Sequence, residues 1–560
     1  MATLEHAETG QSQTIPVAEA RAGRWERVEQ ALVWLGDRVN PILVKETRQA
    51  LKSRQFVVTF TLVLILAWAW SILGVSMIGP SIYYAARGFD LFQGYYVILA
   101  VPLMVIVPFG AFRSLASERE DGTYELLSIT TLRPRQIVGG KLGSAMLQML
   151  VYFSAIAPCL AFTYMLKGID VPTIAYVLYY SFIASLGLSV IGLVVATLTP
   201  EKHWQIVLSV VFLFGLGAAL WSALILVMGA LPSAPPAFQD RTFWIVNAII
   251  QTAYWGYFVL FYCAAAAQLT FASDNRSTRL RQVMIAHQAL LTGWVVWGFY
   301  EAEGELAILI IYLMLSGIHW ALMGMFLNSE VGDISLRVKR QLPQSFLGRA
   351  FFTWFNPGPA TGWMFTVANL LSALVIGAGL STFGYLVFPN RTGGPMFGSA
   401  PHLLVVAFGF LMFAYIVVYL GVGRLLVALV RRFSPVTISS AVSMQLLLVL
   451  AGSGIPLSVH WMMPDIRRDY SLLEITNPFY SLYEVVDVHD FIPEVMALMI
   501  LVPLAAAGVA LMNLPGVVTA VRQVRLAKPR RVEEEDLQEA ALRAPAPGPS
   551  SPFDDESDAV

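Results

Sequence analysis

Residues 56–78 read FVVTFTLVLILAWAWSILGVSMI, an apolar run without one charged side chain. An α-helix rises about 1.5 Å per residue, so about 20 such residues cross the ~30 Å hydrocarbon core of a bilayer. Stretches of the same kind recur along the whole chain. The expected membrane spans lie at about 56–78, 91–112, 137–166, 172–199, 204–230, 243–272, 283–300, 306–327, 363–388, 401–423, 438–463 and 491–514.

The composition agrees with this reading. Hydrophobic residues make up 57% of the chain and charged residues 13%, and the mean hydropathy is +0.65. A soluble core does not absorb that much apolar sequence, so we expect an all-α, polytopic helical membrane protein with about 12 transmembrane helices. The first 55 residues hold no short apolar region typical of a cleavable signal peptide, so the first span is expected to act as its own insertion signal.

The placement of basic residues predicts the orientation. Of the 36 Lys and Arg residues, 30 fall in alternate segments beginning with the N-terminal one, when Lys141 is counted with the loop before the third span. By the positive-inside rule both termini are cytoplasmic. Because the basic residues serve topology and do not gather into one patch, no nucleic-acid partner is expected.

The expected spans carry little that could bind a coupling ion. Apart from Lys141 they contain no Lys or Arg, and Glu494 at the outer edge of the last span is the one acid. Ion-coupled transporters generally keep an ionisable residue at mid-membrane. His287 and His319, in the cytoplasmic halves of neighbouring spans, are the nearest candidates for a proton or substrate role.

No catalytic motif appears. A phosphate-binding loop needs Gly-x4-Gly-Lys-Ser/Thr, but Gly140-Lys141 has Arg135 at the first Gly position and Leu142 at the hydroxyl position. The two cysteines, Cys159 and Cys263, lie inside spans and cannot form a thiolate metal cluster. We therefore expect no enzyme activity, no catalytic residue, no metal and no cofactor in this chain.

The segment between the second and third spans is charged and helix-prone. Residues 117–127 read SEREDGTYELL, with a break expected at Gly122-Thr123, and Pro134 restarts the chain into the third span. A charged segment between two spans, without catalytic groups of its own, is suited to contact a soluble partner.

This segment resembles a known family. The run Glu118-Arg119-Glu120-x-Gly122-Thr123-x-Glu125-Leu126-Leu127, followed by Thr131-Leu132-Arg133-Pro134, Ile137 and Gly140-Lys141-Leu142, is similar to the permease subunits of type-2 ABC exporters. The resemblance implies that residues 114–127 form a coupling helix that docks on a separate cytoplasmic ABC ATPase, which would carry ATP and Mg. It also implies that the protein is located in the cytoplasmic (inner) membrane of a bacterium. The partner-binding residues would be Glu118, Arg119, Glu120, Gly122, Thr123 and Glu125.

Two further segments are similar to parts of the same family. In residues 31–55, Lys45, Arg48 and Lys52 share one helical face, which predicts an interfacial helix resembling the family's elbow helix. Residues 477–484, NPFYSLYE, precede the last span and resemble the family's amphipathic segment before its sixth span, without the basic residue that usually closes it.

The span count predicts two permease halves in one chain. We expect a flexible N-terminus (1–30), the elbow helix (31–55), a first half (56–272), a degenerate second half (273–514) and a basic, then acidic, disordered cytoplasmic tail (515–560). Gly332-Asp333 lies where a second coupling loop should be but lacks the charged Gly-Thr core. On this basis Glu330→Lys should be milder than Glu118→Lys.

The sequence thus predicts an ABC exporter permease powered by a separate ATPase, with membrane lipids around it and room for a further permease or accessory subunit. Substrate-binding residues stay unassigned. Three alternatives stay open: an ion-coupled secondary transporter, a non-transporting membrane scaffold and a membrane-embedded enzyme.

Overall fold

The structure is a computed structural model. It describes residues 40–122, 132–198, 202–271, 274–330, 352–388, 401–462, 470–487, 493–523 and 530–543, and also residues 335, 338, 345 and 348. Within these ranges the elements are helical and no strand occurs. Twelve helices are long and apolar enough to cross a membrane. For the described residues, the expected all-helical fold with 12 helices of membrane-spanning length is therefore confirmed, whereas the cytoplasmic location of the termini stays a prediction.

The spans form two bundles of six. The first bundle consists of α3 (Arg54–Ile78), a second span built from α4 (Gly88–Val101), η2 (Pro102–Ile106) and α5 (Val107–Glu120), then α7 (Pro134–Met165), α8 (Val171–Thr197), α9 (Lys202–Ile225) with η3 (Leu226–Ala230) and α10 (Leu231–Ser233), and α11 (Arg241–Gln268). The second consists of α12 (Thr278–Glu301), α13 (Leu306–Asn328), α16 (Pro359–Val387), α17 (Pro401–Val430), α18 (Ile438–Met462) and α20 (Pro493–Gln523).

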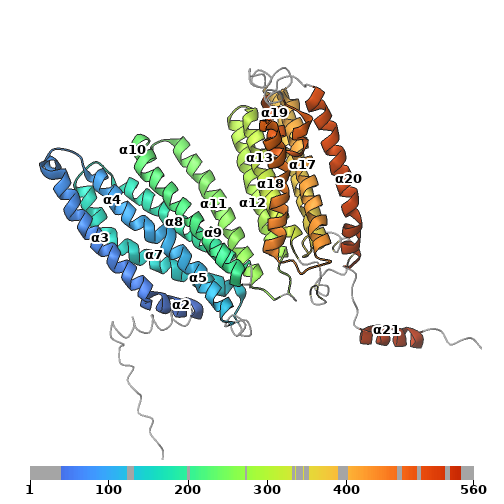
Figure 1. The fold of residues 1–560 in the computed structure, drawn as a ribbon, viewed down its shortest axis with the longest axis horizontal. Helices are drawn as coiled ribbons and strands as arrows, with labels where there is room; N and C mark the ends of the chain where they lie inside the picture. Colours follow the sequence, from blue (N-terminus) through green and yellow to red (C-terminus); the bar gives the residue numbers. More distant parts are fainter. Residues whose placement is uncertain are drawn as a thin grey trace, which may run out of the picture.

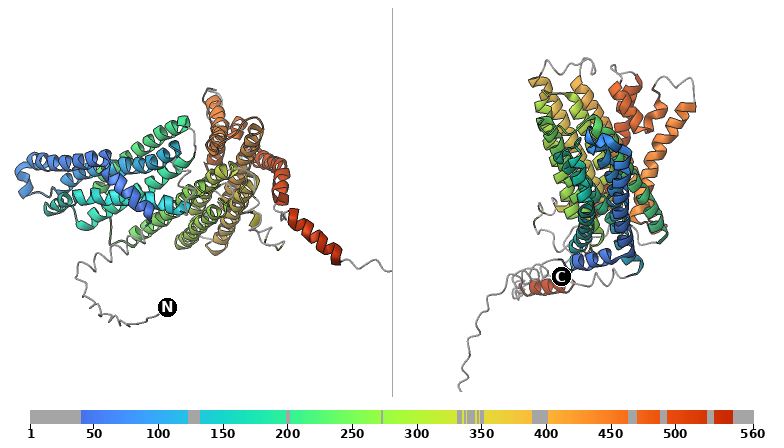
Figure 2. Two further views of the ribbon diagram at one scale, coloured as in Figure 1. Left: turned by 90° about the horizontal axis from the view of Figure 1, so that it is seen from below. Right: turned by 90° about the vertical axis from the view of Figure 1, so that its left-hand side faces the viewer.

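Three shorter helices and two 3-10 turns complete the described elements. They are α2 (Pro41–Lys52), η1 (Gly79–Tyr83) at the end of the first span, η4 (Leu472–Thr476) with α19 (Pro478–Asp487), and α21 (Arg530–Arg543). The two bundles stand side by side, and α2 lies across one end of the first bundle (Figures 1 and 2). We call this end of both bundles the α2 end and the other the far end. The main contact between the bundles is made by α11 and α12.

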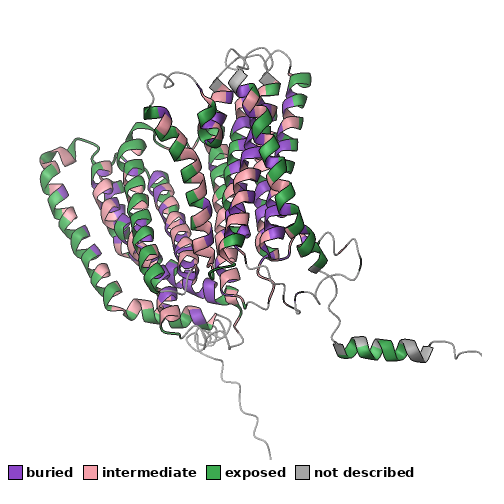
Figure 3. Ribbon diagram, turned by 45° about the vertical axis from the view of Figure 1, so that its right-hand side comes forward, coloured by how far each residue is buried: buried purple, intermediate pink, exposed green. Residues whose placement is uncertain are grey.

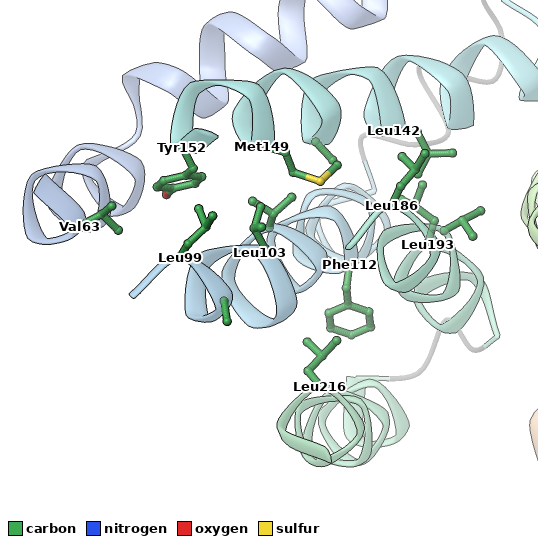
Figure 4. Packing of buried hydrophobic residues seen from close by; sticks show 14 of the residues in the cluster. Val63, Leu99, Leu103, Phe112, Leu142, Met149, Tyr152, Leu186, Leu193 and Leu216 are labelled. Carbon is green, nitrogen blue, oxygen red and sulfur yellow. The ribbon is translucent and has the colours of Figure 1, made fainter. Parts of the chain in front are cut away.

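Each bundle has its own hydrophobic core. One cluster of buried residues draws on α2 to α11, and the other, from Leu260 onward, draws mainly on α12 to α20. In the first core, Met149 and Tyr152 of α7 point toward Leu99 and Leu103 of the second span (Figure 4). Exposed residues cover the outward faces of the peripheral helices, where lipid is expected (Figure 3).

The second span is interrupted inside the membrane. Pro102 has no N–H to donate, and residues 102–106 adopt a π-helical turn in place of the α-helical ladder. The Leu103 carbonyl accepts a hydrogen bond from the buried Ser185 hydroxyl of α8. Freed backbone groups at membrane depth need such partners, because lipid supplies none. Beyond the turn, α5 continues past the expected limit at residue 112 to Glu120.

Part of the C-terminal tail, expected to be disordered over 515–560, is helical, while residues 524–529 and 544–560 lie outside the described residues. The last span continues through Pro515 to Gln523, and residues 530–543 form α21. The reason is local, because this segment is rich in Glu, Ala, Leu and Arg, which favour helix, and Arg531 pairs with Glu535 one turn later at 3.5 Å.

Candidate functional site

The α2 helix is defined at its start by its sequence. The Asn40 side chain accepts the Ile42 N–H at 3.1 Å as the N-cap, and Pro41 occupies the first turn, where no N–H is needed. Ile42 and Glu46 face inward, while Lys45, Arg48 and Lys52 are exposed. The helix covers 41–52 of the predicted segment 31–55, and residues 31–39 lie outside the described residues. Its contact with a membrane surface stays a prediction.

Two glycines of α7 allow α2 to lie directly on it. A Cβ atom at Gly140 would stand 2.7 Å from Cγ2 of Ile42, and one at Gly143 would stand 2.8 Å from Cδ1 of Leu43. Real Cβ atoms do not approach that closely, so larger residues would push the two helices apart. The Gly140-Lys141 pair, which cannot be a phosphate loop, therefore serves helix packing and a buried charge.

Lys141 is the centre of an ion cluster. Its side chain is 1% exposed, and its Nζ atom lies 3.1 Å from the Glu46 carboxylate of α2 and 2.9 Å from the Glu118 carboxylate of α5. It also donates to the Ser114 carbonyl at 3.1 Å. Lys45 lies at the rim, 3.3 Å from Glu118. The cluster ties α2, α5 and α7 together at the α2 end.

Such a cluster fixes geometry more than it adds stability. Burying charges costs several kcal/mol per ion in desolvation, and only close pairing and hydrogen bonds compensate for it. Removing one partner of a buried pair typically costs about 3–5 kcal/mol. Glu46, Glu118 and Lys141 therefore hold the three helices in one arrangement, since any other leaves a buried charge unpaired.

The last turns of α5 lead from this cluster to an exposed tip. Arg119 donates to the Thr197 carbonyl at 2.7 Å, at the C-terminal end of α8, where the helix dipole favours a cation. Glu120 is half-buried and Asp121 is exposed. Gly122 has a φ of +67°, the left-handed conformation that glycine adopts at helix ends.

The six residues predicted to contact a partner therefore differ in position. Glu118 and Arg119 make contacts inside the protein, Glu120 and Gly122 lie at the tip, and Thr123 and Glu125 fall outside the described residues. The sequence reasoning missed Glu46 and gave Lys141 only a topological role. The available signal was that Lys141 is the one basic residue inside an expected span.

The second bundle has an ion pair at the corresponding place. Arg281 of α12 is fully buried, and its Nη2 atom lies 2.7 Å from Oε2 of Glu330, just after α13. Glu330 also accepts the Ser277 hydroxyl at 2.7 Å and the Gly358 N–H at 2.9 Å. Arg431, directly after α17, donates to the Glu330 carbonyl at 3.0 Å. Gly332-Asp333 lies outside the described residues.

The two histidines flagged by the sequence lie where the bundles meet. His287 of α12 and His319 of α13 are buried with ring centroids 5.1 Å apart. The Tyr257 hydroxyl of α11 is 3.2 Å from Nδ1 of His319, and Gly256 leaves room for the His287 ring. Among the described residues, no group of three or more potential metal ligands occurs.

The segment before the last span is helical, as α19. It follows a buried turn in which Glu474 is fully buried and accepts the Asn477 side chain at 2.8 Å. Tyr470 and Ser481 hydrogen bond through their hydroxyls at 2.8 Å. Burial raises the pKa of Tyr470 to about 12, so it stays protonated at neutral pH. One side of this segment is packed on the bundle, while Phe479 and Tyr483 are 69% and 58% exposed, as interfacial anchoring by these rings would require.

Comparisons with known proteins assign no family. No family model, no curated protein and no solved structure matches this chain. Its function must therefore be argued from its own residues.

Proposed function

We propose that this chain is the membrane permease of a type-2 ABC exporter, located in the cytoplasmic membrane of a bacterium and powered by a separate ATPase subunit. One observation carries the proposal. The second span continues as α5, is held to α2 and α7 by the Lys141 cluster, and ends in the acidic tip Glu120-Asp121-Gly122. A lever needs such an anchor, because a loosely attached helix would absorb motion without transmitting it.

The acids at the tip support a docking role. Carboxylates in the last turn of a helix oppose its dipole, which costs a few tenths of a kcal/mol each. Glu118 compensates by pairing with Lys141 at 2.9 Å. Glu120 and Asp121 have no ion pair among the described residues. A basic surface on a soluble partner would supply the missing complement.

The mechanism follows from this arrangement. ATP binding would close two ATPase subunits against each other, and the tip of α5 would move with the subunit on which it docks. Because α5 continues through η2 into α4, its motion would reach the far end of the first bundle. The π-helical turn at residues 102–106, at a break in the regular ladder, is the natural place for the span to bend.

Charge reversal at the tip tests this proposal. The variant Glu120→Lys/Asp121→Lys should fold normally, since neither side chain belongs to the buried cluster, but should lose ATP hydrolysis from the eluate when the tagged chain is purified from native membranes in mild detergent. Arg432→Glu, an exposed change at the α2 end of the second bundle, is the matched control and should keep that activity. Equal ATPase recovery from both variants would contradict a docking role for the tip.

A further inference from the structure

A groove opens at the far end of the first bundle, where the first span turns back into the second. It has a volume of about 320 Å³ and lies between α3 with its terminal turn η1 and the start of α4. Its walls are largely apolar, and Trp70, Met77 and Leu91 contribute to them. The helix α3 forms one edge of the molecule (Figure 1), and Met77 in the groove wall is 74% exposed.

The inner wall of the groove is firmly built. The Trp70 indole N–H donates to the Leu91 carbonyl at 3.1 Å, which fixes the ring against α4. Gly94 makes this possible, because a Cβ atom there would stand 2.0 Å from the Trp70 ring. A Cβ atom at Gly74 would likewise stand 2.2 Å from the Leu91 side chain. The close packing of α3 on α4 therefore fixes the shape of the groove.

Its position matches the boundary between acyl chains and headgroups. Tyr83 and Tyr84, directly after the first span, are 83% and 84% exposed. Tyrosine is enriched at this level of a membrane, where an apolar ring and a polar hydroxyl find suitable surroundings. The apolar wall lies on the membrane side of these residues, and polar groups line the outer rim.

The rim carries one charge of each sign. Nη1 of Arg87 lies 3.1 Å from Oδ2 of Asp90, and the two side chains are 48% and 53% exposed. Exposed pairs of this kind contribute about 0–1 kcal/mol, so a ligand can separate them at little cost. A ligand that offers an anion to Arg87 and a cation to Asp90 would replace the pair with two charge-assisted hydrogen bonds.

We propose that this groove binds one zwitterionic phospholipid of the phosphatidylethanolamine type. Its phosphate would lie against Arg87, its primary ammonium would donate to Asp90, and one acyl chain would follow the wall past Met77. An anionic phosphatidylglycerol satisfies Arg87 but brings no cation to Asp90. The quaternary amine of phosphatidylcholine has no N–H to donate. The proposal does not depend on the exporter assignment.

Native mass spectrometry of the full-length protein tests this inference. The detergent-purified protein is offered equal amounts of phosphatidylethanolamine and phosphatidylglycerol, and the retained lipid is identified. We expect one retained phosphatidylethanolamine, favoured over phosphatidylglycerol by up to about fivefold, the factor for one exposed charge contact. Asp90→Asn should abolish the preference, and Arg87→Gln should reduce retention of both lipids.

The control variant is Arg241→Gln, which removes a basic side chain that is 77% exposed and begins α11 at the same end of the bundle. It should leave both retention and preference unchanged. Equal retention of the two lipids by the unaltered protein would overturn the proposal, as would an Asp90→Asn protein that keeps the preference.

Discussion

The two bundles each place a paired glutamate at the end of their second span, Glu118 in its last turn and Glu330 directly after it, but they use it differently. In the first bundle, Glu118 pairs with Lys141 of the third span, and Glu46 of α2 shares that cation. In the second bundle, Glu330 pairs with Arg281 of the first span and accepts the Gly358 N–H directly before α16. The first cluster thus holds an extra helix against the bundle, and the second closes the bundle on itself.

This difference indicates a division of labour. In the first bundle α5 ends in a half-buried to exposed acidic tip, whereas Arg431 caps the chain at Ser329 and Glu330 directly after α13. The capped end of α13 suits a rigid support, and the exposed tip of α5 suits a contact that moves with a partner. The predicted asymmetry between the halves gains a physical basis here, although its functional consequence stays a prediction.

The largest effect is expected from reversing the charge of Glu330 in the second bundle. Glu330→Lys places a second cation beside the fully buried Arg281 and removes the acceptor of three hydrogen bonds. We expect loss of a folded protein, seen as loss of the monodisperse peak in size-exclusion chromatography. The two glutamate side chains are similarly exposed, 15% for Glu118 and 18% for Glu330. Lys141 keeps the Glu46 carboxylate at 3.1 Å when Glu118 is replaced, so Glu118→Lys should retain that peak.

This ranking differs from the sequence-based expectation that Glu330→Lys is the milder change, and both stay predictions. The sequence-based expectation treated Glu330 as a weakened docking residue, whereas its carboxylate pairs with the buried Arg281. The opposite result would be a monodisperse Glu330→Lys protein and an aggregated Glu118→Lys protein. It would mean that the first bundle is the rigid support and the second carries the moving contact.

The second prediction concerns the centre of the first cluster. Lys141→Met leaves Glu46 and Glu118 facing each other in a buried site, and should lower the free energy of unfolding by about 3–5 kcal/mol. The measurement is the denaturation midpoint in detergent. Adding Glu46→Gln and Glu118→Gln should recover part of the loss, because the unpaired charges disappear. If the triple variant is no more stable than the single one, burial of unpaired charge is not the cause.

The sequence specified much of this fold and less of the site. Spans such as 56–78 are predictable because apolar length alone decides them, and the structure extends that one only to 54–83. The break at Gly122 was also readable, since glycine tolerates a positive φ. The pairing of Glu46 with Lys141 was not, because residues 95 positions apart meet only after α2 has packed on α7.

A third prediction compares two glycines near the start of the third span of each bundle. A Cβ atom at Gly362 would stand 2.8 Å from the Leu327 backbone carbonyl, whereas one at Gly140 meets the Ile42 side chain at 2.7 Å. Backbone yields less readily than a side chain, so Gly362→Ala should destabilise more than Gly140→Ala, both within about 1–3 kcal/mol. Gly215→Ala, with nothing within 4 Å, is the control and should not destabilise. The measurement is the thermal unfolding temperature. If Gly140→Ala lowers it more than Gly362→Ala does, the contact of α2 with α7 yields less than the contact of α16 with Leu327, contrary to this prediction.

The smallest expected effect lies at the rim of the first cluster. Lys45 is 54% exposed and 3.3 Å from Glu118, so Lys45→Gln should cost about 0.2–1 kcal/mol and less in high salt, where exposed charges are screened. The loss caused by Lys141→Met should change little with salt, because that site is buried. In the Lys141→Met background, Lys45 would become the nearest remaining cation to the two carboxylates, so its removal should then cost more than in the unaltered protein. Equal, salt-sensitive losses for Lys45→Gln and Lys141→Met would mean that the cluster is a surface network. Such a network could not anchor α5 as a lever, and the contrast between the two bundles would lose its physical basis.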